Sequence, residues 1–129
     1  GVLLRNKYLE FICKNVFVKI KNKQNTYFKN IDNEVLELHI AHNEGNYFCT
    51  KDQLKEIEDN EQVAINYCNK EGKTDEQFNP NGSIKNIAGI FNKEKNVLGM
   101  MPHPERMIDA SLSGEDGSIF LNNLINNLK

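Results

Sequence analysis

His103 and Glu105 are the two residues whose types and spacing could most readily perform chemistry. Residues 101–105 read Met-Pro-His-Pro-Glu and follow an apolar run, Val97–Met101, which we predict to be a buried strand. A residue before proline is pushed towards extended conformations, so we expect the segment to stay extended through Glu105. Alternate residues of an extended chain share a face, which would bring the imidazole and the carboxylate together. Such a pair is the base and the orienting group of a catalytic triad, and the nucleophile would come from elsewhere.

His42 and Glu44 form a second His-x-Glu pair, at the end of a predicted strand and before Gly45, which could permit an unusual backbone angle. The two pairs together could hold a metal ion. However, the chain lacks the Pro-Cys-x-x-Cys motif of the zinc deaminases and the helical His-Glu-x-x-His motif. We therefore predict no metal, and favour a polar loop that lines a pocket over a metal-dependent hydrolase. A solvated loop is the plainer alternative.

Residues 79–83 read Asn-Pro-Asn-Gly-Ser, a segment dense in turn-forming residues. They could form an ordinary turn, or a structured loop at an active-site rim or a subunit interface. The candidate rim residues are Asn79, Asn81 and Ser83. The sequence leaves both readings open.

Cys13, Cys49 and Cys68 show neither pairing nor metal-ligand spacing, and none stands on a glycine-flanked elbow. They are predicted to be reduced packing residues, which is typical of a cytoplasmic protein. With 129 residues, a net charge of −2 and interspersed charges, the chain indicates a single domain, 1–129, with no nucleic-acid surface. No apolar run approaches the length of a membrane span.

Hydrophobic periodicity predicts more strands than helices, as in the back half of an α/β domain. One helix should begin at a Thr50–Gln53 capping box and bury Leu54 and Ile57. A tail helix should be capped by Asp116 and bury a stripe formed by Phe120, Leu121, Leu124, Ile125 and Leu128. The predicted strands are Phe11–Lys21, a short return strand Thr26–Phe28, Glu34–Ala41, Gln62–Cys68, and a hairpin of Ile87–Phe91 with Asn96–Met101.

Four segments together resemble one family, the glutaminase subunits of phosphoribosylformylglycinamidine synthase. They are Ile40–Tyr47, Asn79–Ser83, Ile87–Ile90 and Asn96–Arg106. The opening residues 3–7 and 11–13 fit as well, as does Asp116-Gly117 with its helix, so the resemblance runs through the whole chain. Pro-His-Pro-Glu by itself is shared more widely among class I glutamine amidotransferases. The resemblance implies an α/β fold, the C-terminal part of a flavodoxin-like class I amidotransferase domain.

The resemblance also implies a function in purine biosynthesis. In that family a cysteine on a glycine-rich elbow attacks the side-chain amide of glutamine, a histidine shuttles protons and a glutamate orients the histidine. These two roles carry over to His103 and Glu105. The ammonia passes to a synthetase subunit, which would hold the ATP and Mg and is accompanied by a small third subunit; the chain itself would need no cofactor.

Two positions depart from the family pattern: Asn43 replaces a glycine, and His39 stands where proline is common. Asn tolerates left-handed backbone angles, so the loop could survive. The family's elbow should precede Gly1, so we expect this chain alone to be inactive and to expose sheet edges at Ile87–Phe91 and Val97–Met101, which could drive self-association. A non-catalytic module that docks on the synthetase is the alternative.

Overall fold

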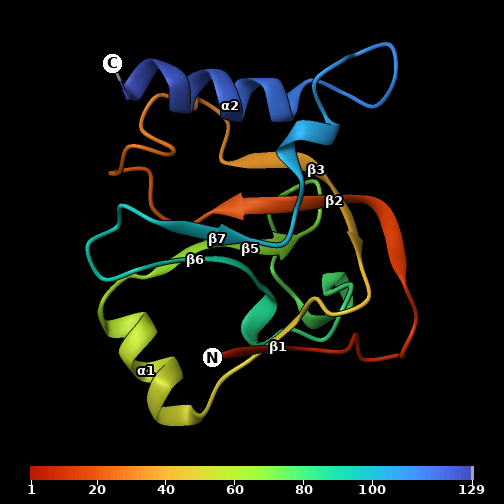
Figure 1. Ribbon diagram of the computed structural model, residues 1–129, viewed down its shortest axis with the longest axis vertical. Helices are drawn as coiled ribbons and strands as arrows, with labels where there is room; N and C mark the ends of the chain where they lie inside the picture. Colours follow the sequence, from red (N-terminus) through yellow and green to blue (C-terminus); the bar gives the residue numbers. More distant parts are fainter. Residues whose placement is uncertain (129) are drawn as a thin grey trace.

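The computed structural model describes residues 1–128, which form a five-stranded sheet, a two-stranded sheet, two α-helices and three 3₁₀ turns (Figure 1). The large sheet has the order β3-β2-β5-β6-β7 and is antiparallel throughout, and β1 pairs with β4. The strands are β1 Val2–Leu4, β2 Ile12–Ile20, β3 Val35–His42, β4 Asn46–Phe48, β5 Val63–Cys68, β6 Ile87–Phe91 and β7 Leu98–Met100. The helices are α1 Lys51–Asp59 and α2 Asp116–Asn127, and the turns are η1 Glu76–Phe78, η2 Ile84–Asn86 and η3 Pro104–Arg106.

The β2–β3 ladder is the longest in the sheet and runs from the pair Ile12–His42 to the pair Lys19–Val35. Alternate residues of β3 are buried: Leu36, Leu38, Ile40 and His42 face the core, whereas His39 and its alternates face outward. Because side chains alternate along a strand, this register decides on which side of the sheet each histidine lies. His42 therefore belongs to the interior and His39 to the outer face.

The main core lies under the inner face of the sheet. Phe28, Phe91 and Phe120 pack there edge to face or tilted, with ring centroids 5.7–6.1 Å apart for the Phe28 pairs. Each fully buried aromatic side chain stabilises the fold by about 1.5–3 kcal/mol. The predicted stripe on α2 is only partly correct: Phe120 is buried, but Ile125 is 53% and Leu128 72% exposed.

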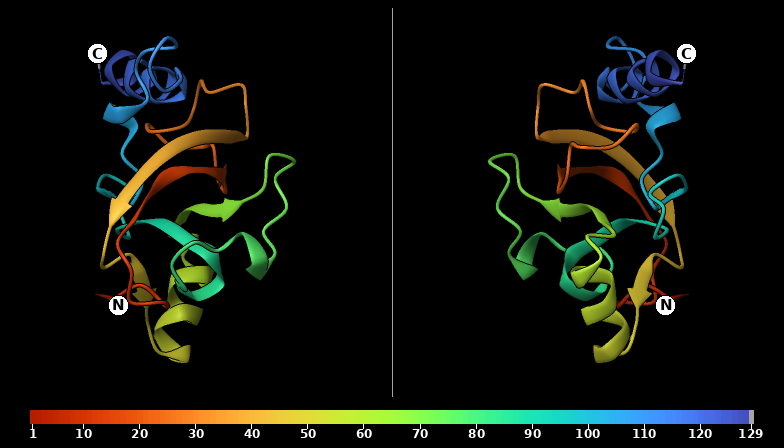
Figure 2. Two further views of the ribbon diagram at one scale, coloured as in Figure 1. Left: turned by 90° about the vertical axis from the view of Figure 1, so that its right-hand side faces the viewer. Right: turned by 90° about the vertical axis from the view of Figure 1, so that its left-hand side faces the viewer.

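Helix α1 forms as predicted. Thr50 Oγ1 accepts a hydrogen bond from the Gln53 N–H, and the Gln53 side chain accepts one from the Thr50 N–H. This capping box satisfies backbone donors that the first turn leaves unpaired. Leu54 and Ile57 are buried in a second cluster, so α1 closes one end of the sheet while α2 lies at the other (Figures 1 and 2).

Two local predictions are wrong. Residues 26–28 are a turn and not a strand, because the Asn25 side chain accepts the N–H groups of Tyr27 and Phe28. Asp116 does not cap α2; its carboxylate accepts the backbone N–H of Glu37 and so ties the helix to β3.

The expected sheet edges are half correct. Strand β6 is paired on both sides, by β5 and β7, and so has no free edge. Strand β7 is one of the two edge strands of the sheet, with β3 at the other edge. Its residues are only half-buried or exposed, so the expectation of a buried strand there is wrong. Several large apolar side chains are exposed, among them Leu3, Phe11, Phe48 and Val97, the last of which directly precedes β7. None of the helices within residues 1–128 is long and apolar enough to cross a bilayer.

Candidate functional site

The His103 and Glu105 side chains meet, as their spacing predicts. Nδ1 of His103 lies 2.8 Å from Oε1 of Glu105, and the two side chains are 35% and 59% exposed. An ionised carboxylate can only accept a hydrogen bond, so Nδ1 carries a proton and donates a hydrogen bond to Glu105. In the neutral ring Nε2 then carries the free lone pair, as a general base requires.

The backbone around this pair is not extended through Glu105, contrary to the prediction. Pro104–Arg106 is a 3₁₀ turn, with Pro104 in its first position and the Met107 N–H donating to the Pro104 carbonyl at 3.0 Å. Proline suits the first position of a helical turn because its φ is already fixed and its missing N–H is not needed there. The turn, rather than strand alternation, brings the carboxylate back onto the imidazole.

Two anchors hold the turn in place. The His103 N–H donates to the His39 carbonyl at 2.7 Å, an isolated bridge that fixes the turn to β3. On the other side, α2 packs against η3 so closely that a Cβ at Gly117 would lie 1.8 Å from the Pro104 carbonyl oxygen. Figure 1 shows η3 between the end of β7 and the start of α2.

His42 is 7% exposed and belongs to a buried polar network with Asn81 and Tyr67. The Asn81 Nδ2 group donates to the His42 Nε2 at 3.0 Å and to the Tyr67 hydroxyl at 3.1 Å, while its Oδ1 accepts the Ser83 N–H at 3.1 Å. The Ser83 N–H can only donate, which fixes the orientation of the amide. His42 Nε2 is therefore an acceptor, and the ring is neutral with its proton on Nδ1.

Burial lowers the pKa of His42, and the neighbouring His103 lowers it further. The two imidazoles are thus close enough for their charges to interact. Within residues 1–128, Nδ1 of His42 has no hydrogen-bond acceptor. A buried donor left without a partner costs about 1–3 kcal/mol, so an acceptor from outside these residues would stabilise the loop.

The loop after β3 is shaped by close packing and not by left-handed backbone angles. Neither Asn43 nor Gly45 has a positive φ, which corrects the expectation for both. Instead, a Cβ at Gly45 would lie 2.0 Å from His42 Nε2. The Asn6 side chain completes the loop, since its amide donates to the His42 carbonyl and its oxygen accepts the Gly45 N–H.

The remaining candidates divide between this network and a groove. Asn81 and Ser83 are buried, Asn79 is half-buried and Glu44 is exposed. The Asn79 side-chain amide donates hydrogen bonds to the Ser83 carbonyl and to Oδ1 of Asn86. Asn79 and Ser83 also line an open groove of about 1470 Å³. Whether these residues touch a substrate stays a prediction.

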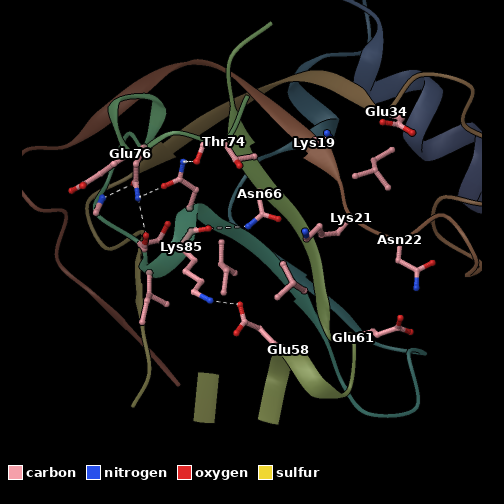
Figure 3. A pocket seen from close by; sticks show the side chains of 18 of the residues that line it. Lys19, Lys21, Asn22, Glu34, Glu58, Glu61, Asn66, Thr74, Glu76 and Lys85 are labelled. Atoms are coloured by element: carbon pink, nitrogen blue, oxygen red, sulfur yellow. Dashed lines mark hydrogen bonds and ion pairs between the residues drawn. The ribbon is translucent and has the colours of Figure 1, made fainter. Parts of the chain in front are cut away.

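The groove itself lies at the far end of β2 from Cys13. Lys19 and Asn66 reach it from the outer face of the sheet, and the Lys85–Glu58 ion pair, 2.6 Å long, lies along it (Figure 3). Its lining carries both signs of charge, so it offers no single-signed field for a charged ligand. Among the described residues that line it, neither His103 nor Glu105 occurs.

Three residues that position the His42 loop and the His103 turn have no signal for this role in the sequence. Asn6 and Tyr67 are buried hydrogen-bonding partners, and Gly117 permits the close approach of α2 to η3. An asparagine near a turn gives no sign that it will be buried, and a glycine inside a predicted helix gives no sign of what it contacts. Within residues 1–128 no three His, Cys, Asp or Glu side chains are grouped to hold a metal ion.

The contact between His103 and Glu105 is the arrangement that a proton-transferring base and its orienting carboxylate would need, and the catalytic role of the pair stays a prediction. In agreement, the chain belongs to the family described as CobB/CobQ-like glutamine amidotransferase domain, which matches residues 2–114.

Among curated proteins, the chain is similar to the phosphoribosylformylglycinamidine synthase subunit PurQ of several bacteria. It is 72% identical over 129 residues to that of Pelagibacter ubique, covering 100% of this chain and 57% of that protein. It is 49% identical over 118 residues to that of Synechocystis sp., covering 91% of this chain and 53% of that protein. The chain thus spans just over half the length of these relatives.

A solved structure agrees with the fold. The chain superposes on a chain of the structure of PurLQS from Thermotoga maritima with a TM-score of 0.78 and 32% identity, covering 100% of this chain and 53% of that chain. The expected architecture, a strand-rich C-terminal part of a class I glutamine amidotransferase domain with a final helix, is confirmed.

The buried, neutral state of His42 predicts a pH dependence of stability. Because its folded-state pKa lies below the ordinary value of 6.5, the unfolded chain binds the proton more tightly. The contribution of His42 to the unfolding free energy is complete above about pH 6.5 and is lost as the pH falls from there towards the folded-state pKa. In His42→Gln the slope of stability against pH should flatten over this range, as measured by denaturant unfolding.

The matched control for that measurement is His39→Gln, which removes an imidazole from the outer face of the same strand. It should retain the slope of the parent. Equal slopes in the parent and in His42→Gln would contradict the assignment of a neutral, buried His42.

Proposed function

We propose that this chain supplies the histidine and glutamate of a glutaminase that serves phosphoribosylformylglycinamidine synthase in purine biosynthesis. The observation that carries the proposal is the 2.8 Å contact between His103 Nδ1 and Glu105 Oε1, which leaves Nε2 free to accept a proton. The PurQ names of its relatives support the pathway.

In this proposal the nucleophilic thiol of the elbow loses its proton to Nε2 of His103 and attacks the glutamine amide carbon. His103 then returns the proton to the leaving ammonia, and later takes one from the water that releases glutamate. Glu105 holds the ring in the productive tautomer and stabilises the imidazolium that forms. The absence of glutaminase activity in this chain alone stays a prediction.

The partners are proposed on the same basis. A synthetase subunit that binds ATP and Mg would receive the ammonia, and a small third subunit would complete the assembly in the cytoplasm. The PurLQS structure of Thermotoga maritima supports a multi-subunit complex. His42, Glu44 and the 79–83 loop are proposed to border the glutamine pocket or the synthetase contact, because His42 is electrostatically coupled to His103 and the Asn81 amide binds His42.

Glutamate release provides the experiment. This chain would be joined to the part of Pelagibacter ubique PurQ that it does not match, and the joined protein assembled with that organism's synthetase. We expect cysteine-dependent hydrolysis of glutamine. A folded assembly that makes product from added ammonia but never from glutamine would contradict the proposed glutaminase and favour the docking role.

Glu105→Gln should lower kcat by roughly 10²- to 10⁴-fold relative to the parent. This fall is smaller than that expected on loss of His103, since the substitution perturbs the orientation of the base without removing it. Glutamate release measures the effect, and Glu94→Gln, in the exposed turn between β6 and β7, is the matched control. An activity equal to that of the parent would show that the carboxylate does not orient His103.

A further inference from the structure

A second group of side chains with chemical potential lies on the outer face of the β2–β3 ladder. Asn15 stands directly opposite His39 in the register, and Cys13 and Glu37 occupy the diagonal positions on either side. Neighbours in these positions on one face of a sheet are within reach of each other. Cys13 is exposed, which corrects its prediction as a packing residue.

The hydrogen bonds within the group have a defined direction. Asn15 Nδ2 donates to Glu37 Oε1 at 3.3 Å, so the Asn15 Oδ1 is the atom that faces His39 Nδ1, at 2.9 Å. An amide oxygen can only accept, so Nδ1 of His39 carries the proton and Nε2 the lone pair. That lone pair faces the Cys13 sulfur at 3.4 Å. A thiol, a base and a group that orients the base are thus arranged in series, as in nucleophilic cysteine sites.

The His39 side chain is not needed to anchor the His103 turn. The contact between the two residues runs through the backbone, from the His103 N–H to the His39 carbonyl. Its imidazole is therefore available to Cys13. The imidazole of His103 is occupied on its Nδ1 side by Glu105.

We propose that Cys13, His39 and Asn15 form a reactive-thiol site, separate from the His103–Glu105 pair, at which a hydroperoxide oxidises Cys13. Acyl transfer would need preorganised donors for an oxyanion. Every second backbone N–H of β2 around Cys13 is instead paired with β3, and the polar side chains grouped with the thiol, Asn15 and Glu37, bond each other and His39. Attack on an O–O bond needs only an exposed nucleophile and a proton for the departing oxygen, and both are present.

The reaction balances with the hydroperoxide as the oxidant. The Cys13 thiol gives its proton to Nε2 of His39, and the sulfur attacks the terminal oxygen of the peroxide. The S–O bond forms as the O–O bond breaks, and His39 returns the proton to the departing oxygen. Cys13 becomes a sulfenic acid, oxidised by two electrons, and the hydroperoxide is reduced to an alcohol, or to water when hydrogen peroxide is used.

The chain contains its own internal controls. Cys49 and Cys68 are 3% and 4% exposed, and burial raises the pKa of the Cys68 thiol to about 11. Neither should react while the protein is folded. Their reactivity therefore reports unfolding in any variant.

The test measures sulfenic acid at Cys13 in the full-length protein, treated with hydrogen peroxide, trapped with dimedone and quantified by mass spectrometry of the Cys13 peptide. In His39→Gln the rate should fall by about tenfold or more, because the thiol loses its base and the departing oxygen its acid. In Asn15→Ala the rate of Cys13 oxidation should fall by a smaller factor, and in Asn15→Asp it should equal that of the parent. Lys14→Gln, which removes a charge on the opposite face of β2 and keeps the imidazole, should leave it unchanged.

Two results would overturn the proposal: no dimedone adduct at Cys13 in the parent, or the parent's rate in a folded His39→Gln. If Cys49 or Cys68 becomes reactive in His39→Gln, that variant has unfolded, and Asn15→Ala then provides the test. The parent's rate of Cys13 oxidation in Asn15→Ala would contradict the proposal. The readout does not depend on glutamine hydrolysis, so failure here would not affect the proposed glutaminase.

Discussion

His103→Ala should abolish glutamine-dependent synthesis by the joined protein and its synthetase, while synthesis from added ammonia continues at the parent's rate. Loss of a triad base typically lowers kcat by a factor of roughly 10⁴ to 10⁶. Ammonia bypasses amide hydrolysis, so it does not need the imidazole. The side chain is 35% exposed and its backbone N–H, not its ring, bonds β3, so the fold should survive the substitution.

The ratio of the two activities is the measurement, because it separates catalysis from docking. Glu94→Gln serves again as a variant that should change neither rate. If His103→Ala lost both activities together, the residue would be supporting the fold or the contact with the synthetase. That result would favour the alternative, a non-catalytic module that docks on the synthetase.

Among the glycine-to-alanine substitutions, Gly117→Ala should have the largest structural effect, because its added Cβ makes the closest approach to fixed backbone atoms. A Cβ at this position would lie 1.8 Å from the Pro104 carbonyl oxygen and 2.6 Å from that of Met107. Reaching an ordinary contact of 3.4 Å requires a shift of about 1.6 Å between α2 and η3, since both obstacles are backbone atoms. Such overpacking costs about 1–3 kcal/mol or more of unfolding free energy.

The same shift should displace His103 and Glu105, and a misplacement of about 1 Å can cost on the order of 10²-fold in rate. Denaturant unfolding and glutamate release measure the two effects. Gly99→Ala, in β7, is the control, because a Cβ there meets no atom within 4 Å and its backbone needs no positive φ. Equal stability and activity in Gly117→Ala and Gly99→Ala would show that α2 does not hold the turn that carries His103 and Glu105.

The parts of the fold that follow a single periodicity could be predicted from the sequence. The alternation in β3 and the capping box at Thr50 and Gln53 specify their elements locally, and both were predicted within about a residue. Side-chain hydrogen bonds that compete with the expected element could not be predicted, whether the partner is distant in sequence or local. Asp116 bonds the Glu37 backbone in place of its own helix, and Thr26–Phe28 turns because Asn25 offers its N–H groups a better acceptor than a neighbouring strand.

The candidate site was predicted in its residues but not in its geometry. The His-x-Glu spacing indicated that His103 and Glu105 meet, yet a 3₁₀ turn and not an extended strand brings them together. The glycines show the same limit: Gly45 is required by the His42 ring packed against it, a contact that only the folded chain contains. The Cys13–His39–Asn15 group depends likewise on the pairing of two strands.

The protonation state of the His103 ring tests the central claim most directly. The geometry requires that Glu105 fix the neutral ring with its proton on Nδ1, leaving Nε2 as the base. In the full-length protein labelled with ¹⁵N-histidine, NMR at a pH where the ring is neutral should show a protonated Nδ1 and an unprotonated Nε2 for the resonances that disappear in His103→Gln. The opposite tautomer, with the proton on Nε2, would direct the lone pair at Glu105 and contradict the account.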